Sequence, residues 1–210
     1  ALLDAVTPAT RLLVLNAPNN PTGWTLTRQE QQAILDHCRR TGTWILADEV
    51  YERLYYGESS CPATSGDGSG PGEGEGRAAM PDLRAAGAAG EAGTRCAPSF
   101  LDIAAPDDRL VVAHSFSKSF LMTGWRLGWL VMPPGLVEPM GKLIEFNTSC
   151  ASTFTQRGAL AAVTRSDEVT PRVVAHLQAC RDTLVPALQA LPEVRVAPAP
   201  GGMYAFFQLA

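Results

Sequence analysis

The sequence has little excess charge of either sign and no long apolar run. Seventeen basic residues stand against 21 acidic ones among 210 residues, a formal net charge of −4. A basic footprint for nucleic acid or for an anionic membrane surface is therefore absent. No apolar run approaches the roughly 20 residues that span a bilayer, and the first residues show no signal-peptide pattern. Neither a nucleic-acid partner nor a membrane partner is expected.

Cysteine and histidine are few and widely spaced. No two cysteines form a CxxC pair, so the sequence indicates neither a disulfide framework nor a zinc site. The cysteines are Cys38, Cys61, Cys96, Cys150 and Cys180. The three histidines, His37, His114 and His176, have no metal-ligand spacing and are interpreted as surface or packing residues. No metal is predicted, and a reducing cytoplasmic location is expected.

The composition that remains is that of a globular protein, since 46% of the residues are apolar and 18% are charged. A continuous apolar run at 12–15 predicts a strand buried on both faces. Thr27 and Glu30 form a capping-box pattern, which predicts a helix over about 27–41. A second buried strand follows within 43–50. Strand, helix and strand in this order predict a parallel crossover unit.

The stretch 57–99 differs from the rest of the chain. It holds ten of the 19 glycines and no aromatic residue. Such a composition cannot build a core and predicts a flexible insertion. The other possibility, a calcium loop, lacks the spaced ligands and the closing glutamate.

Regular patterns resume after this stretch. Strands are predicted at 109–114 and 126–132, and helices over about 136–164 and from near Ser166. A hairpin-like pair is expected from 194–196 and 203–207. These patterns predict an α/β fold with a mostly parallel sheet and flanking helices in 1–165. Residues 166–210 are expected to form a connecting helix and the start of a smaller α+β domain.

The residues that follow the predicted strands are the candidates for a site, because ligands bind at the carboxyl ends of parallel strands. They are Asn20, Asp48, Tyr51, Ser115, Ser117, Lys118 and Arg126. Hydroxyl groups together with an arginine suit a phosphate monoester. A lysine beside them is suited to act as a Schiff-base nucleophile. The structural alternative is that the carboxylate and the lysine only neutralise each other.

Four motifs in one order make the chain resemble the class I and II aminotransferases, fold type I enzymes that use pyridoxal 5'-phosphate. The motifs are Asn19-Asn20-Pro21-Thr22-Gly23, Asp48-Glu49-Val50-Tyr51, Ser115-Phe116-Ser117-Lys118 and Thr123-Gly124-Trp125-Arg126-Leu127-Gly128. Each motif alone is weak, whereas the ordered set is highly specific. Turn residues in the first motif also make the Asn20–Pro21 bond a candidate for the cis isomer.

The resemblance implies a role for each matched residue. Lys118 forms the Schiff base with the coenzyme, and Asp48 faces the pyridine nitrogen and keeps it protonated. Tyr51 and Asn20 donate hydrogen bonds to the phenolic oxygen of the ring. The resemblance thus implies that Lys118, Asp48 and Tyr51 are the catalytic residues.

The phosphate of the coenzyme would be held by Ser115, Ser117 and Arg126. The implied reaction is ping-pong transamination between an amino acid and a 2-oxo acid, in a protein that is a homodimer when full length. The resemblance also implies a fragment. A phosphate loop and a ring-stacking aromatic residue would precede it, and a carboxylate-binding arginine would follow it.

Two other functions, as well as a purely structural or degenerate fragment, remain open at this level. One is a transcription regulator whose aminotransferase-like domain binds the coenzyme or a ligand without turnover, since fold does not fix function. The other is a different pyridoxal-phosphate activity, such as a carbon–sulfur lyase or a decarboxylase.

Overall fold

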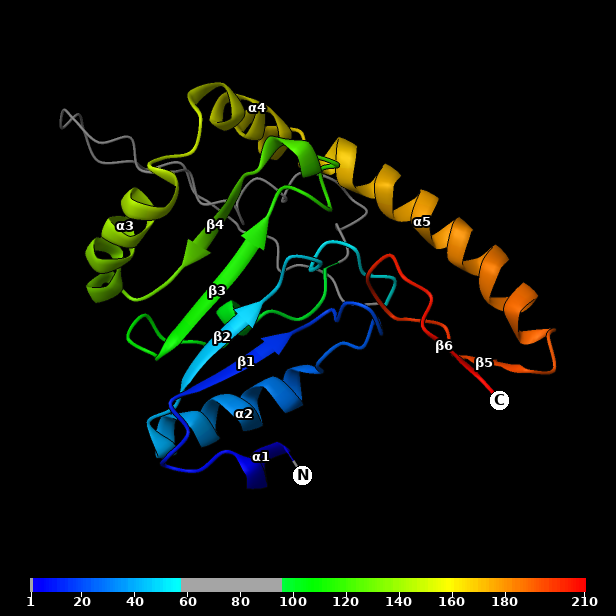
Figure 1. The fold of residues 1–210 in the computed structure, drawn as a ribbon, viewed down its shortest axis with the longest axis horizontal. Coiled ribbons are helices and arrows are strands. Elements are labelled where there is room, and N and C mark those ends of the chain that lie inside the picture. Colours follow the sequence, from blue (N-terminus) through cyan, green and yellow to red (C-terminus); the bar gives the residue numbers. More distant parts are fainter. Residues whose placement is uncertain (1, 58–95) are drawn as a thin grey trace.

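The sheet has three parallel strands and one antiparallel strand. The computed structural model describes residues 2–57 and 96–210. Its four-stranded sheet has the order β1-β2-β3-β4, and β4 is antiparallel to β3 (Figure 1). The strands are β1 (Leu12–Asn16), β2 (Trp44–Asp48), β3 (Leu110–Ser115) and β4 (Gly128–Val131). The α/β fold with a mostly parallel sheet and flanking helices is therefore confirmed.

Helix α2 (Arg28–Thr41) connects β1 to β2 and covers one face of the sheet (Figure 1). It begins with the predicted capping box, in which Thr27 and Glu30 each satisfy a backbone N–H of the other. It ends at Gly42, whose φ of 71° is in the left-handed region that glycine adopts without strain. Ile34 and Leu35 on its inner face join the core formed with the strands.

The remaining helices are α1 (Leu2–Ala5), α3 (Pro134–Thr148), α4 (Thr153–Thr164) and α5 (Ser166–Gln189). The prediction of one helix over 136–164 is wrong, because α3 and α4 are separate. Ser149 ends α3 with a φ of 62°, which a helix cannot continue through. Short 3₁₀ turns lie at Phe100–Asp102 and Thr123–Trp125.

The predicted hairpin-like pair is present with a later second strand. Strand β5 (Val194–Val196) pairs in antiparallel fashion with β6 (Phe207–Leu209), not with 203–207. Residues between these two strands form hydrogen bonds with the turn after β2 instead. Tyr56 donates its N–H to the Pro200 carbonyl at 2.9 Å, and Gly202 donates to the Leu54 carbonyl at 2.8 Å. The division into a large and a small domain stays a prediction.

The predicted insertion at 57–99 falls largely outside the described residues. Its last four residues are described, and Cys96 and Ala97 are buried. Ala97 donates its N–H to the Glu52 carbonyl at 2.8 Å, and the Pro98 carbonyl accepts from the Gln31 side chain at 2.8 Å. Residues 96–99, which the prediction placed in the flexible insertion, thus contact the described part of the fold.

One cysteine departs from the expectation of no disulfide framework. Cys96 is disulfide-bonded. Cys38, Cys150 and Cys180 are free cysteines.

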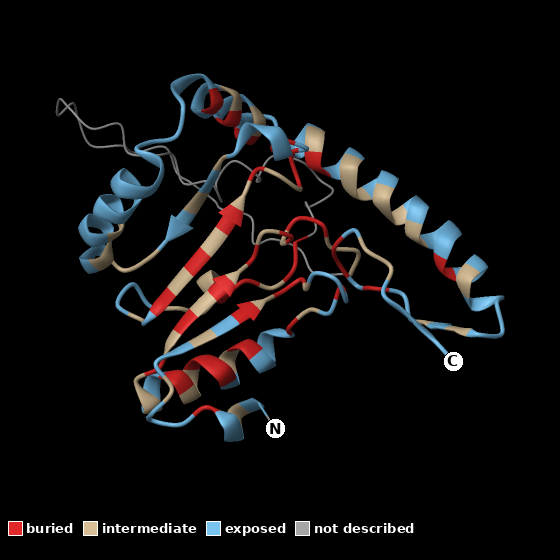
Figure 2. Cartoon of the chain, viewed as in Figure 1, coloured by how far each residue is buried: buried red, intermediate tan, exposed pale blue. Residues whose placement is uncertain are grey.

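Burial is uneven across the fold. Buried residues concentrate in β2, β3 and the inner face of α2, whereas α3 and the far end of β4 are exposed (Figure 2). The prediction of a strand buried on both faces at 12–15 is wrong, because Leu12 and Val14 of β1 are exposed. Phe146 on α3 is 90% exposed and Phe154 on α4 is 73% exposed. Within the described ranges 2–57 and 96–210, no helix combines the length and apolarity needed to cross a bilayer.

We expect Thr27→Ala to lower the free energy of unfolding by about 0.5–2 kcal/mol, because it removes the hydroxyl that accepts the Glu30 N–H at 3.2 Å. Urea denaturation measures the change. Thr183→Ala is the control, since the Thr183 hydroxyl only donates back to the Ala179 carbonyl within α5. Alanine is the better helix former there, so that variant should lose no stability. Equal stability of wild type and Thr27→Ala would contradict the role of the cap.

Candidate active site

The carboxyl ends of β1, β2 and β3 lie side by side at one edge of the sheet (Figure 1). Asn16 is paired with Asp48, and Asp48 is paired with Ala113. The Asn16 side chain donates to the Asp48 carbonyl at 3.3 Å and accepts the N–H of Asn20 at 2.7 Å. This contact fixes the loop that follows β1, in which the Asn20–Pro21 bond is cis as predicted and the Ala17–Pro18 bond is also cis.

Tyr51 lies at the centre of the candidate site and is 2% exposed. The Asn20 amide donates to its hydroxyl at 3.5 Å. The hydroxyl of Tyr204 lies 2.9 Å from it. The Lys118 ammonium lies 5.5 Å from the centroid of the Tyr51 ring. The structure therefore brings three of the predicted residues together and adds a fourth, Tyr204, that the sequence reasoning did not select.

Burial is the main reason why the pKa of Tyr51 is raised, and the neighbouring Tyr204 acts in the same direction. The nearby charge of Asp48 acts in the same direction, whereas the hydrogen bond from Asn20 lowers the pKa. A raised pKa keeps the hydroxyl protonated at neutral pH. Tyr51 is therefore a hydrogen-bond donor under physiological conditions.

Asp48 is half-buried at the end of β2. Its carboxylate accepts the Val50 N–H at 3.4 Å. In the part of the chain that the structure describes, Asp48 and Lys118 form no ion pair within 4.0 Å, which argues against the structural alternative. The carboxylate keeps capacity to accept a hydrogen bond from a ligand.

Of the remaining predicted residues, Ser115 is the last residue of β3, and Ser117 and Arg126 lie with Lys118 in the loop between β3 and β4. The Phe116 N–H donates to the Leu127 carbonyl at 3.2 Å and closes the base of this loop. The Ser115 hydroxyl accepts the Ser117 N–H at 3.1 Å. Phe116 and Phe120 of this loop are buried in a core cluster with Ala159 and Val163 of α4. One hairpin thus carries both serines, Lys118 and Arg126.

Arg126 follows the 3₁₀ turn with a φ of 54°, in the left-handed region. Its guanidinium donates to the Thr123 carbonyl at 3.0 Å, and the Thr123 hydroxyl donates to the Ser117 carbonyl at 2.9 Å. These contacts link the arginine to the two serines. Arg126 is exposed and keeps donors for an anion.

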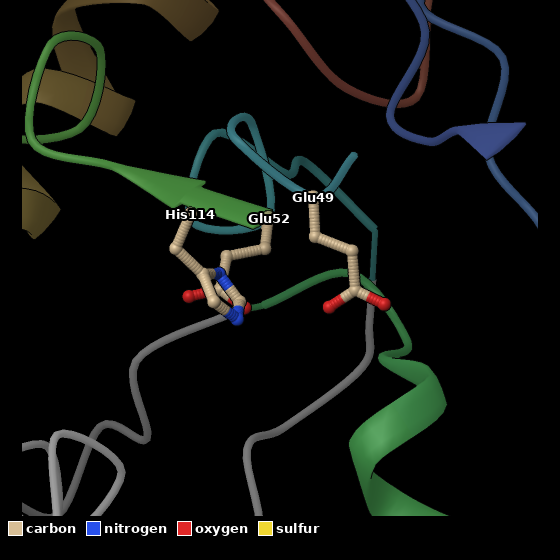
Figure 3. A group of neighbouring side chains, drawn as sticks. All are labelled: Glu49, Glu52 and His114. Carbon is tan, nitrogen blue, oxygen red and sulfur yellow. The ribbon is translucent and has the colours of Figure 1, made fainter. Parts of the chain in front are cut away.

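A second polar cluster lies where the turn after β2 meets β3. Side-chain ligand atoms of Glu49, Glu52 and His114 lie within 4.8 Å of one another (Figure 3). His114 is buried and stacks on Trp129 with ring centroids 4.9 Å apart, as expected of a packing residue. The Glu49 carboxylate accepts the Phe100 N–H at 2.9 Å. No spacing pattern predicts this cluster, because Glu49 and Glu52 follow β2 whereas His114 lies on β3, far along the chain.

The whole chain matches the family model for aminotransferase class I and II over residues 1–210. The chain belongs to the class I and II aminotransferases. It is 29% identical over 206 residues to an aspartate aminotransferase of Musicola paradisiaca, covering 98% of this chain and 42% of the relative. It is 33% identical over 159 residues to an aromatic-amino-acid aminotransferase of Thermococcus litoralis, covering 75% of this chain and 31% of the relative.

A solved structure gives the same result. The aromatic aminotransferase of Pyrococcus horikoshii superposes with a TM-score of 0.75 at 25% identity, covering 98% of this chain and 46% of that chain. This chain thus spans less than half the length of each of these relatives.

Members of this aminotransferase family depend on pyridoxal 5'-phosphate, and the donor set of the site fits that coenzyme. Amide and hydroxyl donors for a phenolic oxygen meet where Asn20 and Tyr51 lie 3.5 Å apart. An amine is close by in Lys118. The loop after β3 offers hydroxyls and a guanidinium, which suit a phosphate dianion. The site thus offers a carboxylate for the pyridine nitrogen, donors for the phenolic oxygen, and hydroxyls with a guanidinium for the phosphate.

We expect Gly128→Ala to destabilise the aminotransferase by about 1–3 kcal/mol and to weaken coenzyme binding. An added Cβ would lie 2.5 Å from the His114 carbonyl oxygen, so the β3–β4 pairing next to Ser115 would have to open. Thermal unfolding with and without coenzyme measures both effects. Gly124→Ala is the control, because no described atom lies within 4 Å of its added Cβ. The same melting temperature for both variants would refute the predicted clash.

Proposed function

We propose that this chain is the coenzyme-binding part of a pyridoxal-phosphate-dependent aminotransferase. The single observation that carries the proposal is the convergence of Asn20, Tyr51 and Lys118 from the ends of three parallel strands. The substrates are an amino acid and a 2-oxo acid. The coenzyme, when bound, supplies an electron sink for the electrons released as the α proton of the substrate leaves.

Each residue of the site has a defined task in this proposal. Lys118 would hold the coenzyme covalently, and its amine, once freed, would act as the base that takes the proton from the α carbon and as the acid that gives it back. Asp48 holds a proton on the pyridine nitrogen. Tyr51 and Asn20 donate to the phenolic oxygen. The reaction is ping-pong, because the first oxo acid leaves before the second one binds.

The loop after β3 has the task of binding the phosphate. The hydroxyls of Ser115 and Ser117 and the guanidinium of Arg126 are the groups proposed for it, supported by their place in one hydrogen-bonded loop. A fixed anchor at the phosphate limits the rotation of the ring, so that Lys118 and Tyr51 meet the correct atoms.

Homodimer formation and a cytoplasmic location are also part of the proposal. Exposed apolar side chains on α3 and α4, including Ile144, Phe146 and Phe154, support an association surface. The free thiols of Cys38, Cys150 and Cys180 support a reducing compartment, whereas the disulfide at Cys96 argues against one.

We expect borohydride reduction of the full-length protein loaded with coenzyme to fix the coenzyme on Lys118, as identified by peptide mass. Lys118→Ala should abolish the adduct. Lys142→Ala is the matched control, because Lys142 is exposed on α3 and paired with Glu138 at 2.8 Å. Labelling of Lys142 in place of Lys118 would overturn the assignment. Amino-acid conversion that needs a 2-oxo acid acceptor distinguishes transamination from lyase activity and from a ligand-sensing domain.

We expect Asp48→Asn to keep the coenzyme bound and to slow transamination by several orders of magnitude, since a neutral amide cannot hold the proton of the pyridine nitrogen. Asparagine keeps an oxygen that can accept the Val50 N–H, so the fold should persist. Stopped-flow half-reactions and thermal unfolding measure the two properties on one sample. Reduced stability with normal turnover would assign Asp48 a structural role.

A further inference from the structure

Tyr204 reaches the site from a segment far along the chain. Its hydroxyl lies 2.9 Å from the hydroxyl of Tyr51, 153 residues away in sequence. The two rings meet edge to face, with centroids 5.9 Å apart and an interplanar angle of 71°. Tyr204 is half-buried and lies in the segment that connects β5 to β6.

Polar contacts hold the segment that carries Tyr204. Tyr55 and Gly201 form an antiparallel bridge, and the Tyr56 hydroxyl donates to the Gly202 carbonyl at 2.6 Å. Arg181 on α5 donates to the Ala199 carbonyl at 3.1 Å, and its guanidinium lies 4.6 Å from the Tyr56 ring centroid. The turn after Tyr51 and the segment of Tyr204 are therefore fixed to each other.

Close packing joins the Asn20 loop to the same segment. An added Cβ at Gly23 would lie 2.3 Å from the Ala199 Cβ, and one at Gly201 would lie 2.9 Å from the Pro18 Cβ. Side chains at either glycine would force these backbones apart. The close packing thus holds together the three segments that carry Asn20, Tyr51 and Tyr204.

The Tyr51 hydroxyl has more hydrogen-bonding capacity than its two observed partners use. A tyrosine hydroxyl donates one proton and accepts up to two. The Asn20 amide can only donate to Tyr51, whereas either hydroxyl of the tyrosine pair can donate to the other. When Tyr204 donates, the Tyr51 oxygen accepts two hydrogen bonds. The proton of Tyr51 is then left for a third acceptor.

We propose that Tyr204 is a positioning residue that donates to the Tyr51 oxygen and thereby directs the Tyr51 proton to the phenolic oxygen of the coenzyme. This inference rests on the proposed function. Hydrogen bonds in a chain polarise one another, so donation from Tyr204 strengthens donation by Tyr51. Stronger donation stabilises the ionised phenolic oxygen. It therefore lowers the pH at which the lysine-bound coenzyme loses its proton.

The test is a pH titration of the coenzyme's visible absorbance in the full-length protein. Tyr204→Phe should raise the midpoint by about half a unit to one unit, the range expected for the loss of one hydrogen bond. Phenylalanine keeps the ring and its edge-to-face packing, so the melting temperature should change little. Tyr55→Phe is the control, because the Tyr55 hydroxyl makes no hydrogen bond with any described residue; its midpoint should match wild type.

A double-mutant cycle shows whether Tyr204 acts through Tyr51. In a Tyr51→Phe background, Tyr204→Phe should produce no further shift of the midpoint, whereas an independent structural effect would add to the first one. An unchanged midpoint in Tyr204→Phe, or additive shifts, would overturn this inference and leave the proposed function standing. A wild-type protein that binds no coenzyme at Lys118 would overturn both.

Discussion

Parallel pairing of β1, β2 and β3 is the constraint on which the rest of the structure depends. Parallel strands must end at the same edge, and the register sets Asn16 beside Asp48 and Asp48 beside Ala113. The loops that carry Asn20, Tyr51 and Lys118 therefore start from one line of backbone. The helix α2 buries this sheet on one face and makes its position rigid. Loops carry the chemistry, and the buried strands give those loops fixed starting points.

Backbone groups at that edge remain satisfied after the strands end. The Ala17 N–H donates to the Asp48 carbonyl at 3.2 Å, and the Glu49 N–H donates to the Ala113 carbonyl at 3.0 Å. Because these hydrogen bonds extend the ladder beyond the regular pairing, the turn toward Tyr51 begins from a rigid point. A hydroxyl placed this rigidly loses little entropy when it meets an acceptor, which is the physical basis of a preorganised site.

Much of the fold could be predicted from local patterns. The capping box at Thr27 gave the start of α2, and short apolar runs gave the strands, because both signals act within a few residues. The break between α3 and α4 was missed, since the left-handed conformation of Ser149 has no strong local signature. Burial of Cys96 and Ala97 was also missed. Small residues beside a glycine-rich stretch carry no periodic signal, and only their contacts with Glu52 and Gln31 place them.

Ordered motifs after short apolar runs were sufficient to predict the α/β class, the family resemblance and the residue types of the site, because each of these signals is local. The contact of Tyr204 with Tyr51 and the cluster of Glu49, Glu52 and His114 became visible only in the folded chain. Contacts between residues far apart in the chain depend on how whole segments pack. Backbone hydrogen bonds between 54–56 and 200–202 hold the segment before Tyr204 away from the strand pairing predicted at 203–207. The Tyr204 hydroxyl therefore reaches the site.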